Sequence, residues 1–153
     1  NPLEVDTTDS NSLDDIVTNT LVSDTRNSDN VYLIVDKPVL LKFRSRDVIH
    51  SAYLPHFRVQ MNCVPGLSTQ FAFTPTKTTT EMREDLEVIK QMEEINRIKL
   101  AKGKEEVKFD YVLLCNKICG GQHFLMDMTF IVETESESES RLYLVSLQRA
   151  GQP

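Results

Sequence analysis

The sequence predicts an all-β sandwich or barrel with one inserted helix. Short runs rich in β-branched and aromatic residues fill residues 31–73, and turn dipeptides such as Leu54-Pro55 and Pro65-Gly66 separate these runs. Over about residues 79–102 the apolar residues instead recur every three or four positions, which is typical of an amphipathic helix. The 153 residues suffice for one domain with a hydrophobic core, and we expect residues 1–153 to form a single domain.

The charge of the chain argues against nucleic-acid binding. The formal net charge is −6, whereas a nucleic-acid binder needs a basic face. An acidic surface favours basic partners, although net charge can also serve solubility alone. The apolar runs are too short to cross a bilayer, and no signal-peptide pattern is visible. Because the chain begins at Asn1 without a methionine, we expect it to be a fragment or a processed form.

The β elements follow in chain order. Residues 1–30 are rich in Asp, Asn, Ser and Thr, with one expected strand at residues 15–22 and a loop at residues 24–30. Several short strands are expected in residues 31–66. Residues 67–73 alternate, with Leu67, Thr69, Phe71 and Phe73 on one face, which predicts a strand with one buried side.

The insert carries the usual signals of a helix. Thr78 followed by Glu81 forms a capping box, and Gly103 is a plausible stop. An apolar stripe is expected to pack on the sandwich rather than to recruit a partner, and it comprises Met82, Leu86, Ile89, Met92 and Ile95.

The last third of the chain returns to β character. Strands are predicted at residues 111–114 and 128–132, on either side of a loop. Residues 135–140, "ESESES", form an acidic low-complexity segment that we expect to be mobile. Residues 141–148 fit either an edge strand or a short helix.

The loop gathers Cys115, Cys119, His123 and Met126 at intervals of three or four residues. Adjacent glycines, Gly120-Gly121, favour a sharp loop over a helix. Zinc seldom takes a thioether, whereas thiolate, imidazole and thioether together suit copper, and two thiolates can bridge two copper ions.

A pair of copper ions bridged by two thiolates requires a second histidine ligand, and the chain has three histidines. His50 lies on a segment that can meet the loop at one end of the sandwich. We interpret His56, which follows a proline, as a surface or packing residue, and Cys63 as a small buried residue.

These residues carry a resemblance to a known family. Asp47-Val48-x-His50-Ser51, followed by Cys115-x3-Cys119-x3-His123-x2-Met126, resembles the dinuclear copper (CuA) domain of cytochrome c oxidase subunit II. The "VPG" at residues 64–66 also stands where that family has it, and the match spans residues 39–132 apart from the helix. The resemblance implies a cupredoxin-like Greek-key β-barrel with the metal site at one end.

The resemblance also implies a ligand set and a role. Cys115 and Cys119 would bridge two copper ions, one of which would take His50 and Met126. The other would take His123 and the backbone carbonyl of Lys117. The domain would accept electrons from a cytochrome c-type donor and pass them to haem in the catalytic subunit, without turnover of its own.

The resemblance further implies a place in the cell. The domain would lie on the periplasmic face of the bacterial inner membrane, or its mitochondrial equivalent, anchored by helices that precede Asn1. Acidic residues around the site, with Asp47 a candidate, would receive a basic donor. Asp47, Ser51 and Asn116 are candidates to orient the imidazoles.

The sequence departs from the family pattern at three points, one of which is the inserted helix over residues 79–102. Lys117 stands where many members have a glutamate that holds magnesium, so we expect no magnesium site through this residue. The chain also has no tryptophan, and the family's electron-entry strand would precede Asn1.

Three alternatives remain at this stage. The CuA domain of nitrous oxide reductase shares the ligand spacing. A copper-delivery or thiol-redox protein would use Cys-x3-Cys with a distant histidine on a βαβ fold. A structural disulfide between Cys115 and Cys119 would leave His123 and Met126 unexplained.

Overall fold

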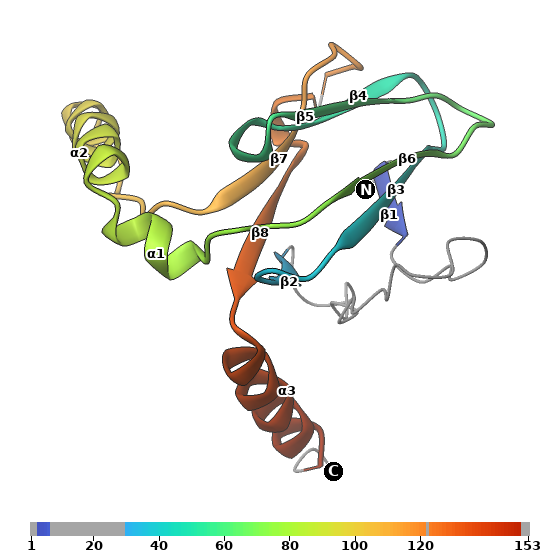
Figure 1. Ribbon diagram of the computed structural model, residues 1–153. Helices are drawn as coiled ribbons and strands as arrows, with labels where there is room; N and C mark the ends of the chain where they lie inside the picture. Colours follow the sequence, from blue (N-terminus) through green and yellow to red (C-terminus); the bar gives the residue numbers. More distant parts are fainter. Residues whose placement is uncertain (1–2, 7–29, 122, 151–153) are drawn as a thin grey trace.

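Two β-sheets form the body of the protein in the computed structural model, which describes residues 3–6, 30–121 and 123–150 (Figure 1). The smaller sheet has the order β1-β3-β6, with strands β1 (Leu3–Asp6), β3 (Val39–Ser45) and β6 (Thr69–Phe73). The larger sheet has the order β2-β8-β7-β4-β5, with strands β2 (Asn30–Ile34), β8 (Asp127–Glu133), β7 (Tyr111–Cys115), β4 (His50–Leu54) and β5 (Val59–Cys63). The expected strand at residues 15–22 lies outside the described residues.

The prediction of an all-β sandwich is confirmed, although the sheets do not close into a barrel. Every pairing is antiparallel except that of β2 with β8, which is parallel. Alternate residues of β3 and β7 are buried, and core residues come from strands of both sheets, so a hydrophobic core fills the space between them. Phe43 in β3 and Phe130 in β8 are its largest fully buried side chains. The alternation predicted in β6 is observed, but Leu67 lies outside the strand and is exposed.

The insert is two helices rather than the one predicted over residues 79–102. Helix α1 (Thr79–Glu84) and helix α2 (Leu86–Ala101) meet at Asp85, whose backbone is extended. The Asp85 side chain accepts a hydrogen bond from the Glu87 N–H and so caps α2, and Lys77 Nζ lies 3.0 Å from its other oxygen. Asp85 is therefore the residue at which α1 ends and α2 begins. The capping box at Thr78 and the stop at Gly103, where φ is +67°, are both observed.

The apolar stripe of the insert packs on the sandwich only in part. Met82 and Met92 pack against the core, but Leu86 is 73% exposed, and Ile89 and Ile95 are also exposed. The prediction was wrong for these three residues because the break at Asp85 ends the continuous stripe, and α2 turns Val88 and Met92 toward the core instead. Figure 1 shows the two helices beside the sheets.

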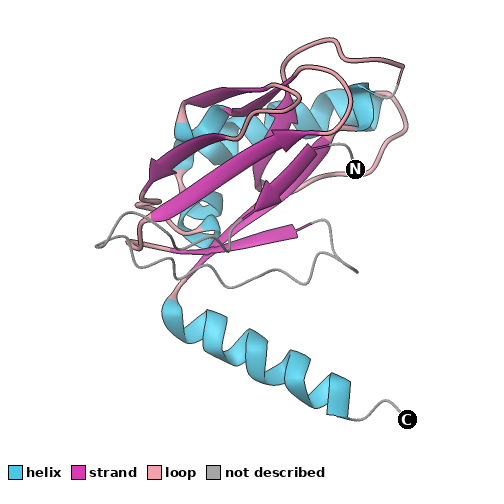
Figure 2. Ribbon diagram, turned by 90° about the vertical axis from the view of Figure 1, so that its right-hand side faces the viewer, coloured by secondary structure: helices cyan, strands magenta, loops and turns pink. Residues whose placement is uncertain are grey.

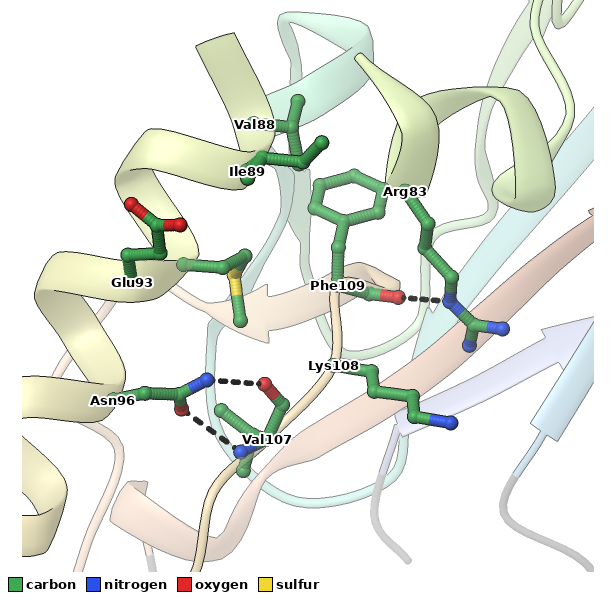
Figure 3. Close-up of a pocket in the computed structure, with 9 residues that line it drawn as sticks. Arg83, Val88, Ile89, Glu93, Asn96, Val107, Lys108 and Phe109 are labelled. Atoms are coloured by element: carbon green, nitrogen blue, oxygen red, sulfur yellow. Dashed lines mark hydrogen bonds between the residues drawn. The ribbon is translucent and has the colours of Figure 1, made fainter. Parts of the chain in front are cut away.

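Side chains of the helices form hydrogen bonds with the backbone of the segment that leads into β7. The Asn96 amide donates to the Val107 carbonyl and accepts from the Val107 N–H, as a neighbouring strand would. Arg83 Nε donates to the Phe109 carbonyl (Figure 3). A groove of about 420 Å³ lies between α2 and this segment, with Val88, Met92 and Phe109 among its lining.

Helix α1 is also bonded directly to the sheet. The buried Thr79 hydroxyl accepts a hydrogen bond of 2.9 Å from the Val132 N–H in β8. This N–H needs such an acceptor because β7 begins at Tyr111, opposite Phe130, and does not reach Val132.

Replacing Thr79 with valine should lower the free energy of unfolding by about 1–3 kcal/mol, because it leaves the Val132 N–H buried without an acceptor. Urea denaturation of the variant checks this expectation. Thr79→Ser is the matched control, since serine keeps the hydroxyl and should lose much less. Equal losses in the two variants would contradict the role of the hydroxyl, because serine retains it.

The chain ends in helix α3 (Glu135–Ala150), so the acidic segment at residues 135–140 is helical and residues 141–148 are not a strand. Arg141 makes a bidentate ion pair with the nearly buried Glu133, and its guanidinium lies 3.8 Å from the centre of the Tyr32 ring. These contacts hold the base of α3, which projects away from the sheets (Figure 2). Within the described residues, no helix combines the length and the apolar character that crossing a membrane requires.

Candidate metal centre

The start of β4 and the end of β7 lie side by side at one end of the larger sheet. The strands are antiparallel, with Ala52 opposite Cys115, so the first residue of β4 lies beside the loop that follows β7. This register brings His50 Nδ1 to 3.7 Å from Cys115 Sγ, although the two residues are 65 positions apart in the chain. The prediction that His50 meets the loop is therefore confirmed.

The loop from β7 to β8 folds back on itself. The Cys115 N–H donates to the Met126 carbonyl, and the His123 N–H donates to the Gly120 carbonyl. Gly120 has φ +140°, a conformation that side-chain-bearing residues rarely adopt. The loop then passes through a short 3₁₀ turn, η2 (His123–Leu125), into β8.

The loop places sulfur, nitrogen and oxygen atoms around one point. The two thiol sulfurs, Cys115 Sγ and Cys119 Sγ, lie 3.7 Å apart. Cys119 Sγ is 3.4 Å from His123 Nδ1 and 3.3 Å from Met126 Sδ. Cys115 Sγ is 3.3 Å from the Lys117 carbonyl oxygen. The structure therefore brings together every residue predicted to be a ligand, with one imidazole beside each of the two cysteine sulfurs.

His50 is held from behind by Asp47. The ring is 1% exposed, and its Nε2 lies 2.7 Å from Asp47 Oδ1, which leaves Nδ1 facing Cys115. The buried Ser45 hydroxyl lies 3.3 Å from the same carboxylate oxygen and also bonds the Val48 carbonyl. The sequence indicated Asp47 but not Ser45. The inward position of Ser45 at the end of the alternating β3 was the signal available for it.

The other two orienting candidates act through the backbone. The Asn116 N–H donates to the Ser51 carbonyl at 2.8 Å, and the Ser51 hydroxyl accepts from Gln60 Nε2. Among the described contacts, neither side chain touches a histidine. These bonds fix the start of the loop against β4.

The two cysteines differ in their protonation. Burial raises the pKa of Cys115, but its hydrogen bonds with the backbone of Ser51 and Lys117 and with the His50 ring outweigh it and bring the pKa to about 6. Burial and the neighbouring Cys115 raise the pKa of Cys119. These opposite shifts make Cys115 the more acidic thiol of the pair, and a positive ion between the sulfurs would favour release of both protons.

His56 and Cys63 stay outside the cluster, as predicted. His56 lies in the 3₁₀ turn η1 (Pro55–Phe57) and packs edge-on against the rings of Phe109 and Tyr111. Cys63 in β5 is fully buried opposite His50.

The surface around the cluster is more apolar than the sequence suggested. A groove of about 450 Å³ opens above Cys119 and is lined by Val48, Ile49, Pro65, Lys117, Ile118 and Cys119. Ile118 is 89% and Phe124 79% exposed. Asp47 is half exposed and is partly committed to His50.

The donor set distinguishes the chemical alternatives. All three cysteines are free thiols, which disfavours a structural disulfide at Cys115 and Cys119. The side-chain donor atoms of His50, Cys115 and Cys119 lie within 4.8 Å of one another, close enough to share a metal ion. Two cysteine thiolates, two imidazole nitrogens and a methionine thioether together fit copper better than zinc.

Comparison with known proteins identifies relatives of the chain. The alternative cytochrome c oxidase subunit 2 of Bradyrhizobium diazoefficiens is 31% identical over 137 residues, which cover 90% of this chain and 36% of the relative. The cytochrome c oxidase subunit 2 of Thermostichus vulcanus is 28% identical over 113 residues, which cover 74% of this chain and 25% of the relative. The chain is a homologue of cytochrome c oxidase subunit II. No protein-family model matches it.

The structural comparison agrees for the fold. The periplasmic domain of subunit II of the cytochrome oxidase of Bradyrhizobium japonicum superposes with a TM-score of 0.51 and 20% identity, over 76% of this chain and 63% of that chain. The subunit II homologue thus has the cupredoxin-like sandwich with added helices. It spans only 36% and 25% of the two curated relatives, so it corresponds to a part of such subunits.

Proposed function

We propose that this subunit II homologue carries single electrons through a dinuclear copper centre. Cys115 and Cys119 would bridge the ions, His50 and Met126 would bind one of them, and His123 with the Lys117 carbonyl the other. The observation that carries the proposal is the close pair of sulfurs, each beside an imidazole Nδ1. A thiolate-bridged copper pair accepts and releases one electron with the charge spread over both metals.

The protein's part in this transfer is to hold the ligands still. His50 is buried on a strand, and the loop is closed by the bond between the Cys115 N–H and the Met126 carbonyl. A ligand set that cannot move keeps its bond lengths similar in both oxidation states, which favours rapid transfer. Lys117 takes part through its carbonyl alone, because its ammonium group would repel a second cation such as magnesium.

The partners follow from the homology and are part of the proposal. The domain would accept electrons from a cytochrome c-type donor and pass them to haem in the catalytic subunit of a haem-copper oxidase. It would work on the periplasmic face of a bacterial inner membrane, or its mitochondrial equivalent, held there by helices of the full-length subunit. The exposed apolar residues around Cys119 suggest that donor binding depends less on charge than the acidic composition implied.

The rival functions have less support. A copper-delivery or thiol-redox protein of βαβ type does not fit the sandwich. The nitrous oxide reductase alternative shares the site, but the relatives that match are oxidase subunits.

Copper loading of the purified domain tests the proposal. We expect two copper ions per chain, a purple colour and an electron paramagnetic resonance spectrum in which one unpaired electron is shared by two copper nuclei. A single blue copper would contradict the dinuclear centre and indicate a mononuclear site, and colourless binding of one Cu(I) would favour a delivery protein.

A further inference from the structure

The carboxylate of Asp47 lies behind His50, on the far side of the ring from the sulfur atoms. Asp47 Oδ1 is 2.7 Å from His50 Nε2, and His50 Nδ1 faces Cys115 Sγ. A neutral imidazole carries one proton, so an acceptor at Nε2 keeps the proton there and leaves the lone pair on Nδ1. We infer that Asp47 is a positioning residue, which fixes the orientation and tautomer of His50 and strengthens Nδ1 as a ligand. This inference rests on the proposed copper centre.

The contact is held in place from a second side. The Ser45 hydroxyl, buried at the end of β3, bonds both Asp47 Oδ1 and the Val48 carbonyl, so the short turn between β3 and β4 has a fixed shape. The Asp47 side chain itself is 51% exposed. A carboxylate in this position has little to contribute to core packing, so its effect falls on the ring that it touches.

The second histidine lacks this support. His123 Nδ1 faces Cys119 Sγ, but among the described residues nothing hydrogen-bonds its Nε2. A negative charge behind one imidazole makes that ring the stronger electron donor. The His50 side of the centre should therefore favour the oxidised state more than the His123 side does.

Two substitutions separate the hydrogen bond from the charge. Asp47→Asn keeps an acceptor oxygen and removes the charge, whereas Asp47→Ala removes both. Asp127→Asn is the matched control, because Asp127 is an exposed acid next to Met126 that makes no described contact with His50. Three measurements are made on each protein: the ¹⁵N NMR shifts of His50 in the metal-free domain, the copper affinity and the reduction potential of the loaded centre.

We expect His50 to stay protonated at Nε2 in the wild type and in Asp47→Asn, and to become a mixture of tautomers in Asp47→Ala. Copper affinity should fall by about 10- to 100-fold in Asp47→Ala, the usual range for loss of a partner behind a metal ligand. The potential should rise in both Asp47 variants. Asp127→Asn should keep the wild-type tautomer and nearly the wild-type potential.

The inference is overturned if Asp47→Ala keeps the wild-type tautomer and copper affinity. It is also overturned if Asp127→Asn raises the potential as much as Asp47→Asn does, since any nearby charge would then suffice. The NMR measurement needs no metal, so it decides the orienting role even if the wild type binds copper in another form. In that case the copper stoichiometry and the paramagnetic resonance spectrum of the wild type would contradict the proposed function, independently of the role of Asp47.

Discussion

Replacing Cys119 with serine should abolish the two-copper centre. Cys119 Sγ lies at the centre of the proposed ligand set, within 3.7 Å of Cys115 Sγ, His123 Nδ1 and Met126 Sδ. A serine hydroxyl stays protonated at neutral pH and cannot bridge two soft metal ions. Copper-to-protein stoichiometry should fall from two to one or none, and the spectrum of an electron shared by two nuclei should disappear.

Cys63→Ala is the matched control, because Cys63 is a buried thiol outside the cluster. This variant should keep both copper ions and the shared-electron spectrum. A serine variant at Cys119 that kept the spectrum would show that the bridging role is wrong, and loss in both variants would point to a general effect on folding.

Replacing Phe43 with alanine should lower the free energy of unfolding by about 3–5 kcal/mol. Phe43 is fully buried in the central strand of the smaller sheet and fills the space between the sheets. Its removal loses the transfer free energy of the ring and leaves a cavity that neighbouring strands cannot close. Because domains of this kind are stable by only about 5–15 kcal/mol, urea denaturation should register a large shift of the midpoint.

Phe124→Ala is the matched control, because it makes the same truncation at the protein surface. Phe124 is 79% exposed, so the same truncation should alter the free energy of unfolding by less than about 0.5 kcal/mol. If Phe43→Ala unfolds the domain completely, Phe43→Leu should give a measurable, smaller loss. Similar values at positions 43 and 124 would refute the placement of Phe43 in the core.

The sequence predicted the β fold and the ligand cluster because both depend on local signals. Alternating apolar residues define strands, and the spacing of Cys115, Cys119, His123 and Met126 lies within one loop. The position of His50 beside this loop was harder to predict, since it depends on the register of β4 against β7. The family resemblance supplied that link.

The remaining features depend on tertiary contacts that no local pattern encodes. The break at Asp85 reflects a side chain that caps α2, although the apolar period continues through it. Helix α3 forms from a segment that fitted either a strand or a helix, and the Glu133–Arg141 ion pair holds its base. The bond of Ser45 to Asp47 links the end of β3 to the following turn, so it becomes visible only in the folded protein.

The paired bonds of Asn96 to Val107 have a consequence for self-association. The segment before β7 belongs to no strand, and backbone N–H and C=O groups left free in such a segment can pair with another molecule. Asn96 occupies both groups of Val107, and Arg83 occupies the Phe109 carbonyl. The helical insert thus keeps these backbone groups from pairing with another molecule.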